Sequence, residues 1–336
     1  MNRILEIFLL CIVLPITMNV IIYFCFSTHY THYVFSESSF SRQYDHGIYK
    51  YRILSKYMLL ELHKIINKNI AESEPKDFLK VLDTEGTNNF YAAYFVLNTF
   101  FSIMFALLVY MLLFNFKFLE YLNNYDKLIS FLNINLLMYI SQYVFVPYDI
   151  SGYTFLILSV ILTLFFLEQK KNIYLLIFCF VLILSTLNRE VSYVSLAFYA
   201  AFFITVGNLK DNIKNLIVPI LCFILTYLLL RIYFGFEHGW IEGIQNNFTP
   251  KVVYKSLPVL IFGTGFIYLL IKNTVGSINQ KLMRTFLILN TPYFITFLIG
   301  GRWIELRLFI PIFFGLIILS KMNPDFIGNI SESKAK

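Results

Sequence analysis

Charged residues are scarce in this chain. Aspartate, glutamate, lysine and arginine together make up 14% of its 336 residues, whereas roughly 25% is usual in a soluble domain. So few charges cannot cover a surface that faces water, and the composition therefore excludes an ordinary soluble protein. Hydrophobic residues make up 58% of the chain, and they occur in runs long enough to cross the hydrocarbon core of a bilayer.

Several other patterns are missing. The four cysteines, at positions 11, 25, 179 and 222, lie in apolar runs without the spacing of a zinc site, which is typical of small buried side chains. No small-residue cleavage site follows Phe26, which favours a retained first span over a signal peptide. The net charge of +7 comes without a basic stripe, so no nucleic-acid partner is predicted.

The apolar runs predict the fold class. A helix that crosses a bilayer needs roughly 20 apolar residues. We predict ten such helices, near residues 5 to 26, 89 to 116, 127 to 146, 152 to 167, 172 to 187, 191 to 207, 213 to 235, 256 to 271, 283 to 300 and 303 to 320. The sequence has no internal repeat. It therefore predicts an all-α, polytopic integral membrane protein, with residues 1 to 336 forming a single transmembrane domain.

The distribution of lysine and arginine predicts the orientation. Lysines such as Lys170, Lys171, Lys214 and Lys281 are concentrated in every second connection between spans. Because connections rich in lysine and arginine stay in the cytoplasm, both termini are expected there, in a protein of the inner (plasma) membrane. The lipid bilayer is then its first partner.

The first predicted outside loop, residues 27 to 88, is long and contains an amphipathic segment. Ile53, Tyr57 and Leu60 recur at helical spacing among polar residues that include Lys56 and His63. This pattern predicts an amphipathic helix that lies in the membrane interface.

The connections at the predicted outer face contain acids and arginines, which are costly at a membrane boundary unless they meet water, a partner or a ligand. Simple explanations exist for several of them: a turn at Asp45, a helix N-cap at Asp149, an ion pair between Arg302 and Glu305. Their convergence instead predicts one shared polar cavity. Its candidate residues are Asp45, Arg52, Asp149, Arg189, Glu190, His238, Arg302, Glu305 and Arg307. No metal site is predicted from the histidines.

Short motifs at these positions carry a family resemblance. They are Asp45, Tyr51-Arg52-Ile53-Leu54, Pro147-Tyr148-Asp149, Asn188-Arg189-Glu190 and Glu305-Leu306-Arg307. With the topology of the whole chain, they resemble the C-type glycosyltransferase-like membrane proteins of bacterial envelope and surface-polysaccharide biosynthesis. The chain departs from better-known members because it lacks a C-terminal soluble domain and a paired Asp-X-Asp.

The resemblance implies transfer of a sugar from a polyprenyl-phosphate-linked donor to a glycan or lipid acceptor on the outer face. Asp45 or Asp149 would then accept the proton of the acceptor hydroxyl as general base. The substrate-binding residues would be Arg189, Arg302 and Arg307 on the lipid phosphate, Glu190 and Glu305 on those arginines or on sugar hydroxyls, and Arg52 and His238 elsewhere in the site. A divalent metal stays open as a cofactor, although no ligand motif is present.

Other functions fit the same sequence. An O-antigen or capsule polymerase would join whole repeat units and use the arginines on a diphosphate. A flippase or transporter of lipid-linked sugars would need charges at mid-membrane, whereas the predicted spans are nearly free of charge inside. A purely structural membrane subunit is the last alternative.

Overall fold

The computed structural model describes residues 3–25, 37–69, 88–143, 146–205, 209–236, 247–301, 303–325 and 327. Within these residues every regular element is a helix and no strand occurs. The prediction of an all-α chain is therefore confirmed. Helices satisfy their own backbone hydrogen bonds, which surrounding lipid cannot do.

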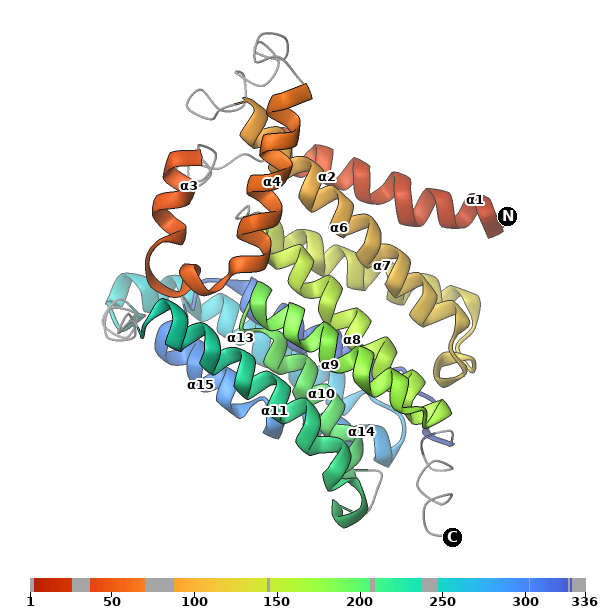
Figure 1. The fold of residues 1–336 in the computed structure, drawn as a ribbon. Coiled ribbons are helices and arrows are strands. Elements are labelled where there is room, and N and C mark those ends of the chain that lie inside the picture. Colours follow the sequence, from red (N-terminus) through yellow and green to blue (C-terminus); the bar gives the residue numbers. More distant parts are fainter. Residues whose placement is uncertain are drawn as a thin grey trace.

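Short connections join several consecutive helices, among them α8 to α9 and α9 to α10 (Figure 1). The long helices, of 21 residues or more, are α6 (Asn88–Asn115), α8 (Asp149–Gln169), α11 (Leu209–Phe234) and α13 (Pro250–Lys272). Shorter ones are α1 (Arg3–Phe8), α2 (Leu14–Cys25), α3 (Glu37–Tyr44), α4 (Ile53–Asn69), α7 (Asn124–Ile140), α9 (Asn172–Asn188), α10 (Ser192–Thr205), α14 (Ser277–Leu289), α15 (Thr291–Gly300) and α16 (Ile310–Ser320). Single turns are η1 (Leu9–Val13), η3 (Gly47–Tyr51), η4 (Lys117–Leu119), η5 (Ser141–Tyr143) and η6 (Leu306–Leu308).

Among the described residues, five helices are long and apolar enough to cross a membrane. They are Arg3–Tyr23, Asn89–Asn115, Asp149–Gln169, Asn212–Phe234 and Pro250–Lys272. A sixth candidate is the pair Ser277–Leu289 and Thr291–Ile299, which is bent by 44°. Helices lie over the other predicted segments as well, but several are shorter, including Asn172–Asn188, Ser192–Thr205 and Ile310–Ser320. Composition and helix length are therefore those of a membrane protein, with five or six candidate spans among the described residues, and the number ten stays a prediction.

Two of the short helices, α10 and α16, lie in the interior. Along α10 and α16 nearly every residue is buried, whereas α11 and α13 expose many large apolar side chains. Close packing explains part of this burial: a Cβ atom on Gly315 of α16 would come within 2.5 Å of Phe286 Cζ of α14. Neighbouring helices surround α10 and α16 on all sides. Their packing can therefore stabilise a helix that is too short to cross a bilayer alone.

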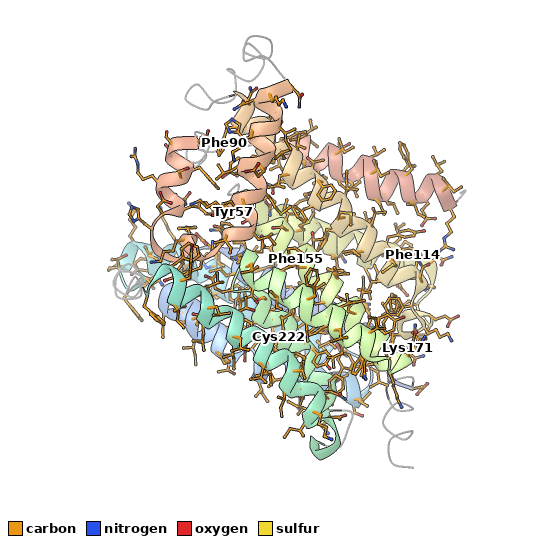
Figure 2. The ribbon with its side chains drawn as sticks, in the orientation of Figure 1. Tyr57, Phe90, Phe114, Phe155, Lys171 and Cys222 are labelled. Atoms are coloured by element: carbon orange, nitrogen blue, oxygen red, sulfur yellow. The ribbon has the colours of Figure 1, made fainter. Side chains whose placement is uncertain are left out.

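The hairpin of α8 and α9 brings two helix ends together. Its two-residue link places Lys170 in the left-handed region at φ 52°, which reverses the chain. Figure 2 shows Lys171 at the Phe114 end of α6, away from Phe90 at the other end. The first residue of α8 and the residues after α9 therefore lie at the same end of the molecule.

The amphipathic segment of the first loop forms α4, which packs on α6. Its buried positions include Ser55, Leu59 and His63 at a spacing of four residues, and the His63 ring lies 4.9 Å from the Phe90 ring of α6. Tyr57 is 60% exposed. The helix is present as predicted, but one of its faces packs against protein. Some of its apolar side chains therefore contact α6, and others, such as Tyr57, are exposed.

Candidate functional site

Seven charged side chains gather where several helix ends meet. They come from five junctions: Arg52 before α4, Asp149 at the start of α8, Arg189 and Glu190 between α9 and α10, Arg231 in the last turn of α11, and Glu305 and Arg307 before α16. We call these residues the charge cluster. Long antiparallel helices with short links bring such junctions together, because alternate connections lie at the same end.

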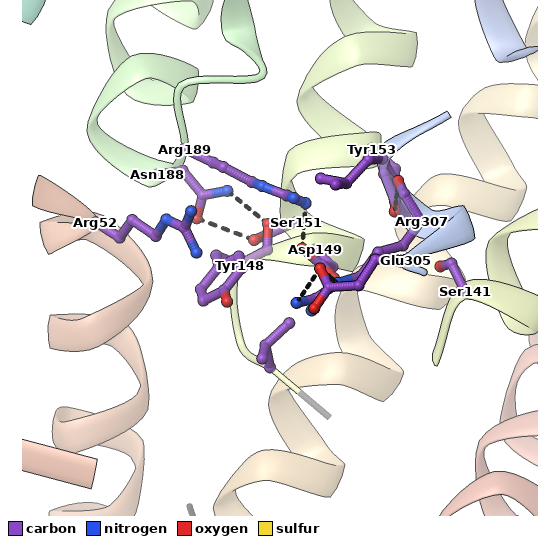
Figure 3. A network of polar contacts seen from close by, with 12 residues as sticks. Arg52, Ser141, Tyr148, Asp149, Ser151, Tyr153, Asn188, Arg189, Glu305 and Arg307 are labelled. Carbon is purple, nitrogen blue, oxygen red and sulfur yellow. Dashed lines mark hydrogen bonds and ion pairs between the residues drawn. The ribbon is translucent and has the colours of Figure 1, made fainter. Parts of the chain in front are cut away.

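Asp149 is the buried centre of the cluster. Its carboxylate, completely buried, accepts one hydrogen bond from Arg189 Nη1 and another from Arg307 Nη1 at 3.1 Å (Figure 3). Arg307 also contacts Glu305 Oε2 at 3.0 Å through Nη2. Burial by itself lowers the pKa of Arg307, but the Asp149 carboxylate and other neighbours outweigh burial and raise that pKa well above its usual value. Charges this deep persist only when they are paired.

Neutral side chains position Asp149. Asn188 donates from Nδ2 to the Tyr148 carbonyl at 3.0 Å, and its Oδ1 accepts from Ser151 Oγ at 3.0 Å. Tyr148, not Asp149, occupies the position before the helix, so the N-cap explanation for Asp149 does not apply. The carboxylate turns to the arginines instead.

Glu190 is paired more loosely. Its Oε2 lies 3.5 Å from Arg52 Nη2, and its Oε1 lies 4.0 Å from Arg231 Nη2. Among the described residues neither Glu190 Oε1 nor the buried Arg52 Nε has a hydrogen-bond partner. The Glu190 side chain is 30% exposed. Glu190 thus lines a cavity with part of its side chain, while its buried Oε1 lacks a hydrogen bond within the described residues.

Aromatic rings hold the two arginines around Glu190. The Arg231 guanidinium carbon lies 3.5 Å from the centre of the Tyr51 ring, and that of Arg52 lies 4.0 Å from the Tyr148 ring. The Tyr51 hydroxyl donates to the Gly235 carbonyl at 2.6 Å. Burial lowers the pKa of Arg52, but Tyr148 and Glu190 outweigh it, so the pKa is raised above its usual value and the guanidinium stays charged.

A cavity of about 390 Å³ opens beside the cluster. Its charged lining residues are Arg52, Arg189, Glu190 and Arg231. The remaining wall is aromatic and apolar, with Tyr51, Tyr193, Tyr227, Phe223, Tyr293, Phe297 and Leu308 among its residues. Asp149 and Arg307 are not in this lining. Such a cavity suits a molecule that joins an anionic group to an apolar or sugar-like body.

The structure tests the predicted cavity residue by residue. It brings together six of the candidates, namely Arg52, Asp149, Arg189, Glu190, Glu305 and Arg307. Asp45 is separate from them: its side chain is 60% exposed and contacts Lys56 Nζ at 3.1 Å. His238 and Arg302 lie outside the described residues.

Sequence reasoning left Arg231 and the tyrosines that stack on the arginines out of the candidate set. Arg231 had a usable signal, since it is a charged residue near the outer end of a predicted span. Tyr51 and Tyr148 stand in two of the short motifs, beside Arg52 and Asp149, but nothing in the sequence shows that their rings stack on arginines.

The described residues contain no group of three or more histidine, cysteine, aspartate or glutamate side chains that could hold a metal ion. Comparisons with protein-family models, with curated proteins and with solved structures find no match to this chain.

Proposed function

We propose that this chain is a membrane glycosyltransferase, which moves a sugar from a polyprenyl-phosphate-linked donor to a glycan or lipid acceptor at the outer face of the inner membrane. The observation that carries the proposal is the cavity lined by Arg52, Arg189 and Arg231 together with tyrosine and phenylalanine rings. A lipid phosphate has an anionic head for the guanidinium groups and an apolar chain for the rings.

The arginines suit a departing phosphate. A guanidinium presents a planar fork that matches two phosphate oxygens, and stacking on Tyr51 and Tyr148 fixes its plane in advance. Because the groups are buried, their attraction for developing negative charge is screened less than in water. These features support binding of the leaving group as the sugar departs.

The transfer needs one proton acceptor. In the proposed step the acceptor oxygen bonds to the anomeric carbon, the bond from that carbon to the phosphate oxygen breaks, and its electron pair leaves with the lipid phosphate. The acceptor proton passes to a carboxylate. Of Asp45, Asp149 and Glu190, only Glu190 lines the cavity within the described residues. We assign it the proton, and we assign Asp149 the positioning of Arg189 and Arg307.

The proposed arrangement in the membrane extends the five or six candidate spans to ten. The shorter helices would cross as members of the bundle, both termini would be cytoplasmic, and α4 would lie at the outer interface. The charge cluster would then face outward. Support comes from the opposite end, where Lys170 and Lys171 join α8 to α9 and Lys117 lies 4.0 Å from Glu168.

The test uses the purified protein in lipid nanodiscs with polyprenyl-phosphate-linked sugars and candidate acceptors. Transfer should release free polyprenyl phosphate, and Arg231→Ala should abolish the release. Lys170→Gln, an exposed change at the opposite end, should leave it unchanged. Growth of a polymer of repeat units on a diphosphate lipid would point to a polymerase. Movement of the lipid-linked sugar between leaflets without chemical change would point to a flippase.

A further inference from the structure

We infer that Glu190 is an internal anion that occupies the phosphate-binding arginines of the empty cavity, and that an entering phosphate displaces it and frees its carboxylate to accept a proton. The inference rests on the proposed function for the chemistry of the ligand. Its basis in the structure is the contrast between two carboxylates of the charge cluster.

Asp149 and Glu190 each lie between two arginines, but their contacts differ. The Asp149 carboxylate is completely buried and each of its oxygens accepts a hydrogen bond. Glu190 is 30% exposed, and its two contacts with arginine nitrogens are 3.5 Å and 4.0 Å long. Among the described residues the buried Oε1 atom of Glu190 makes no hydrogen bond, whereas both oxygens of Asp149 do, so Glu190 loses less than Asp149 when it leaves its arginines. Glu190 is therefore the carboxylate that a ligand can displace.

The two arginines do not depend on Glu190 for their positions. Arg231 lies on the Tyr51 ring, which the hydrogen bond to the Gly235 carbonyl anchors, and Arg52 lies on the Tyr148 ring. When the Glu190 side chain rotates away, both guanidinium groups keep these contacts. The phosphate site is thus built in advance, with Glu190 as its temporary occupant.

A phosphate fits the arginines better than Glu190 does. The buried Arg52 Nε has no hydrogen-bond partner among the described residues, and Glu190 approaches Arg52 through Nη2 alone. A phosphodiester offers oxygens to both nitrogens of the fork. Once released, Glu190 remains beside the cavity that it lines, where an acceptor hydroxyl meets the bound donor. Phosphate binding and the supply of a proton acceptor are then one event.

The charge balance gives a measurable consequence. Two arginines and Glu190 leave one net positive charge, and Glu190→Gln raises it to two while it removes the competing anion. The variant should bind a lipid phosphate more tightly, by about 10-fold, yet transfer no sugar. A residue that merely helped to hold the arginines in place would give the opposite change in affinity.

The experiment measures binding of farnesyl phosphate, a short polyprenyl phosphate, to the purified full chain by isothermal titration calorimetry. Tighter binding by Glu190→Gln supports the inference. The matched control is Glu168→Gln, because Glu168 also lies 4.0 Å from a cation, Lys117, but at the other end of the molecule. Its affinity should equal that of the wild type. Glu190→Asp, which shortens the side chain and weakens its hold on the arginines, should give an intermediate affinity.

The inference is overturned if a folded Glu190→Gln protein binds farnesyl phosphate no more tightly than the wild type does. It is also overturned if neither protein binds farnesyl phosphate. If Glu190→Gln does not fold, Glu190→Asp decides: binding no tighter than wild type overturns the inference. The two proposals can fail separately. If Glu190→Gln binds more tightly but the wild type transfers no sugar, the glycosyltransferase proposal fails and the displacement of Glu190 stands. If the wild type transfers sugar but Glu190→Gln binds no more tightly, the displacement of Glu190 fails and the glycosyltransferase proposal stands.

Discussion

At the scale of single residues, burial decides which charged groups are exchangeable. Asp149→Asn keeps the size of the side chain but leaves Arg189 and Arg307 buried with one negative charge fewer. Breaking such a buried arrangement costs roughly 3–5 kcal/mol. We expect a clear loss of thermal stability in detergent. Asp45→Asn is the comparison, because its exposed contact with Lys56 should barely affect the unfolding temperature. Equal stability of the two variants would contradict the role of Asp149 as the buried counter-charge.

Arg231 gives a second test at this scale. Arg231→Lys keeps the charge but removes the planar group that lies 3.5 Å from the Tyr51 ring centre. Because lysine neither stacks as a plane nor offers a fork to phosphate, binding of farnesyl phosphate should weaken by about 10-fold with folding intact. Titration of the variant beside Lys170→Gln measures this. Wild-type affinity in Arg231→Lys would mean that charge alone is needed there.

At the scale of helices, the packing of α14 against α16 depends on Gly315. An added methyl group would meet the Phe286 ring, which lies in the core, so Gly315→Ala should destabilise the protein by roughly 1–3 kcal/mol. Phe286→Leu in the same chain should restore part of the loss. Gly265→Ala in α13 is the control, since a Cβ there meets nothing within 4 Å. Thermal unfolding of Gly315→Ala, of the double variant with Phe286→Leu, and of Gly265→Ala measures these effects. Equal unfolding temperatures for Gly315→Ala and Gly265→Ala would contradict the explanation.

Much of the helical layout follows from the sequence, because apolar runs bounded by lysine, asparagine and glycine end at predictable places. The same reasoning places Asp149, Arg189 and Arg307 at one end, since alternate connections share an end. The sequence cannot show that Asp149 is more deeply buried and more firmly paired than Glu190, because the burial of both depends on how the helices pack. It also joins Asp45 to the cluster, whereas the structure pairs Asp45 with Lys56, since a long loop does not fix where its residues lie.

At the scale of the whole molecule, the charged groups are divided between two ends. One end holds the charge cluster and the cavity, and the other holds lysines such as Lys117, Lys170 and Lys171. In the proposed orientation, the lysine-rich end faces the cytoplasm and the end with the cavity faces outward. A lipid-linked donor is the sugar source expected outside the cytoplasm, and the cluster would face that side.

The orientation is tested with reporter fusions, one active only in the cytoplasm and one only outside. Fusions after Lys170, Lys214 and Arg284 should report the cytoplasm, and fusions after Asp149, Glu242 and Gly301 should report the outside, because lysine-rich connections resist transfer across the membrane. The tyrosine-lined cavity would then open toward the outer leaflet. A reversed pattern would place the arginines where nucleotide sugars are plentiful, and it would remove the physical reason for a polyprenyl-phosphate donor. The phosphate site and its displaceable Glu190 would stand unchanged, with a cytoplasmic ligand in place of the lipid-linked sugar.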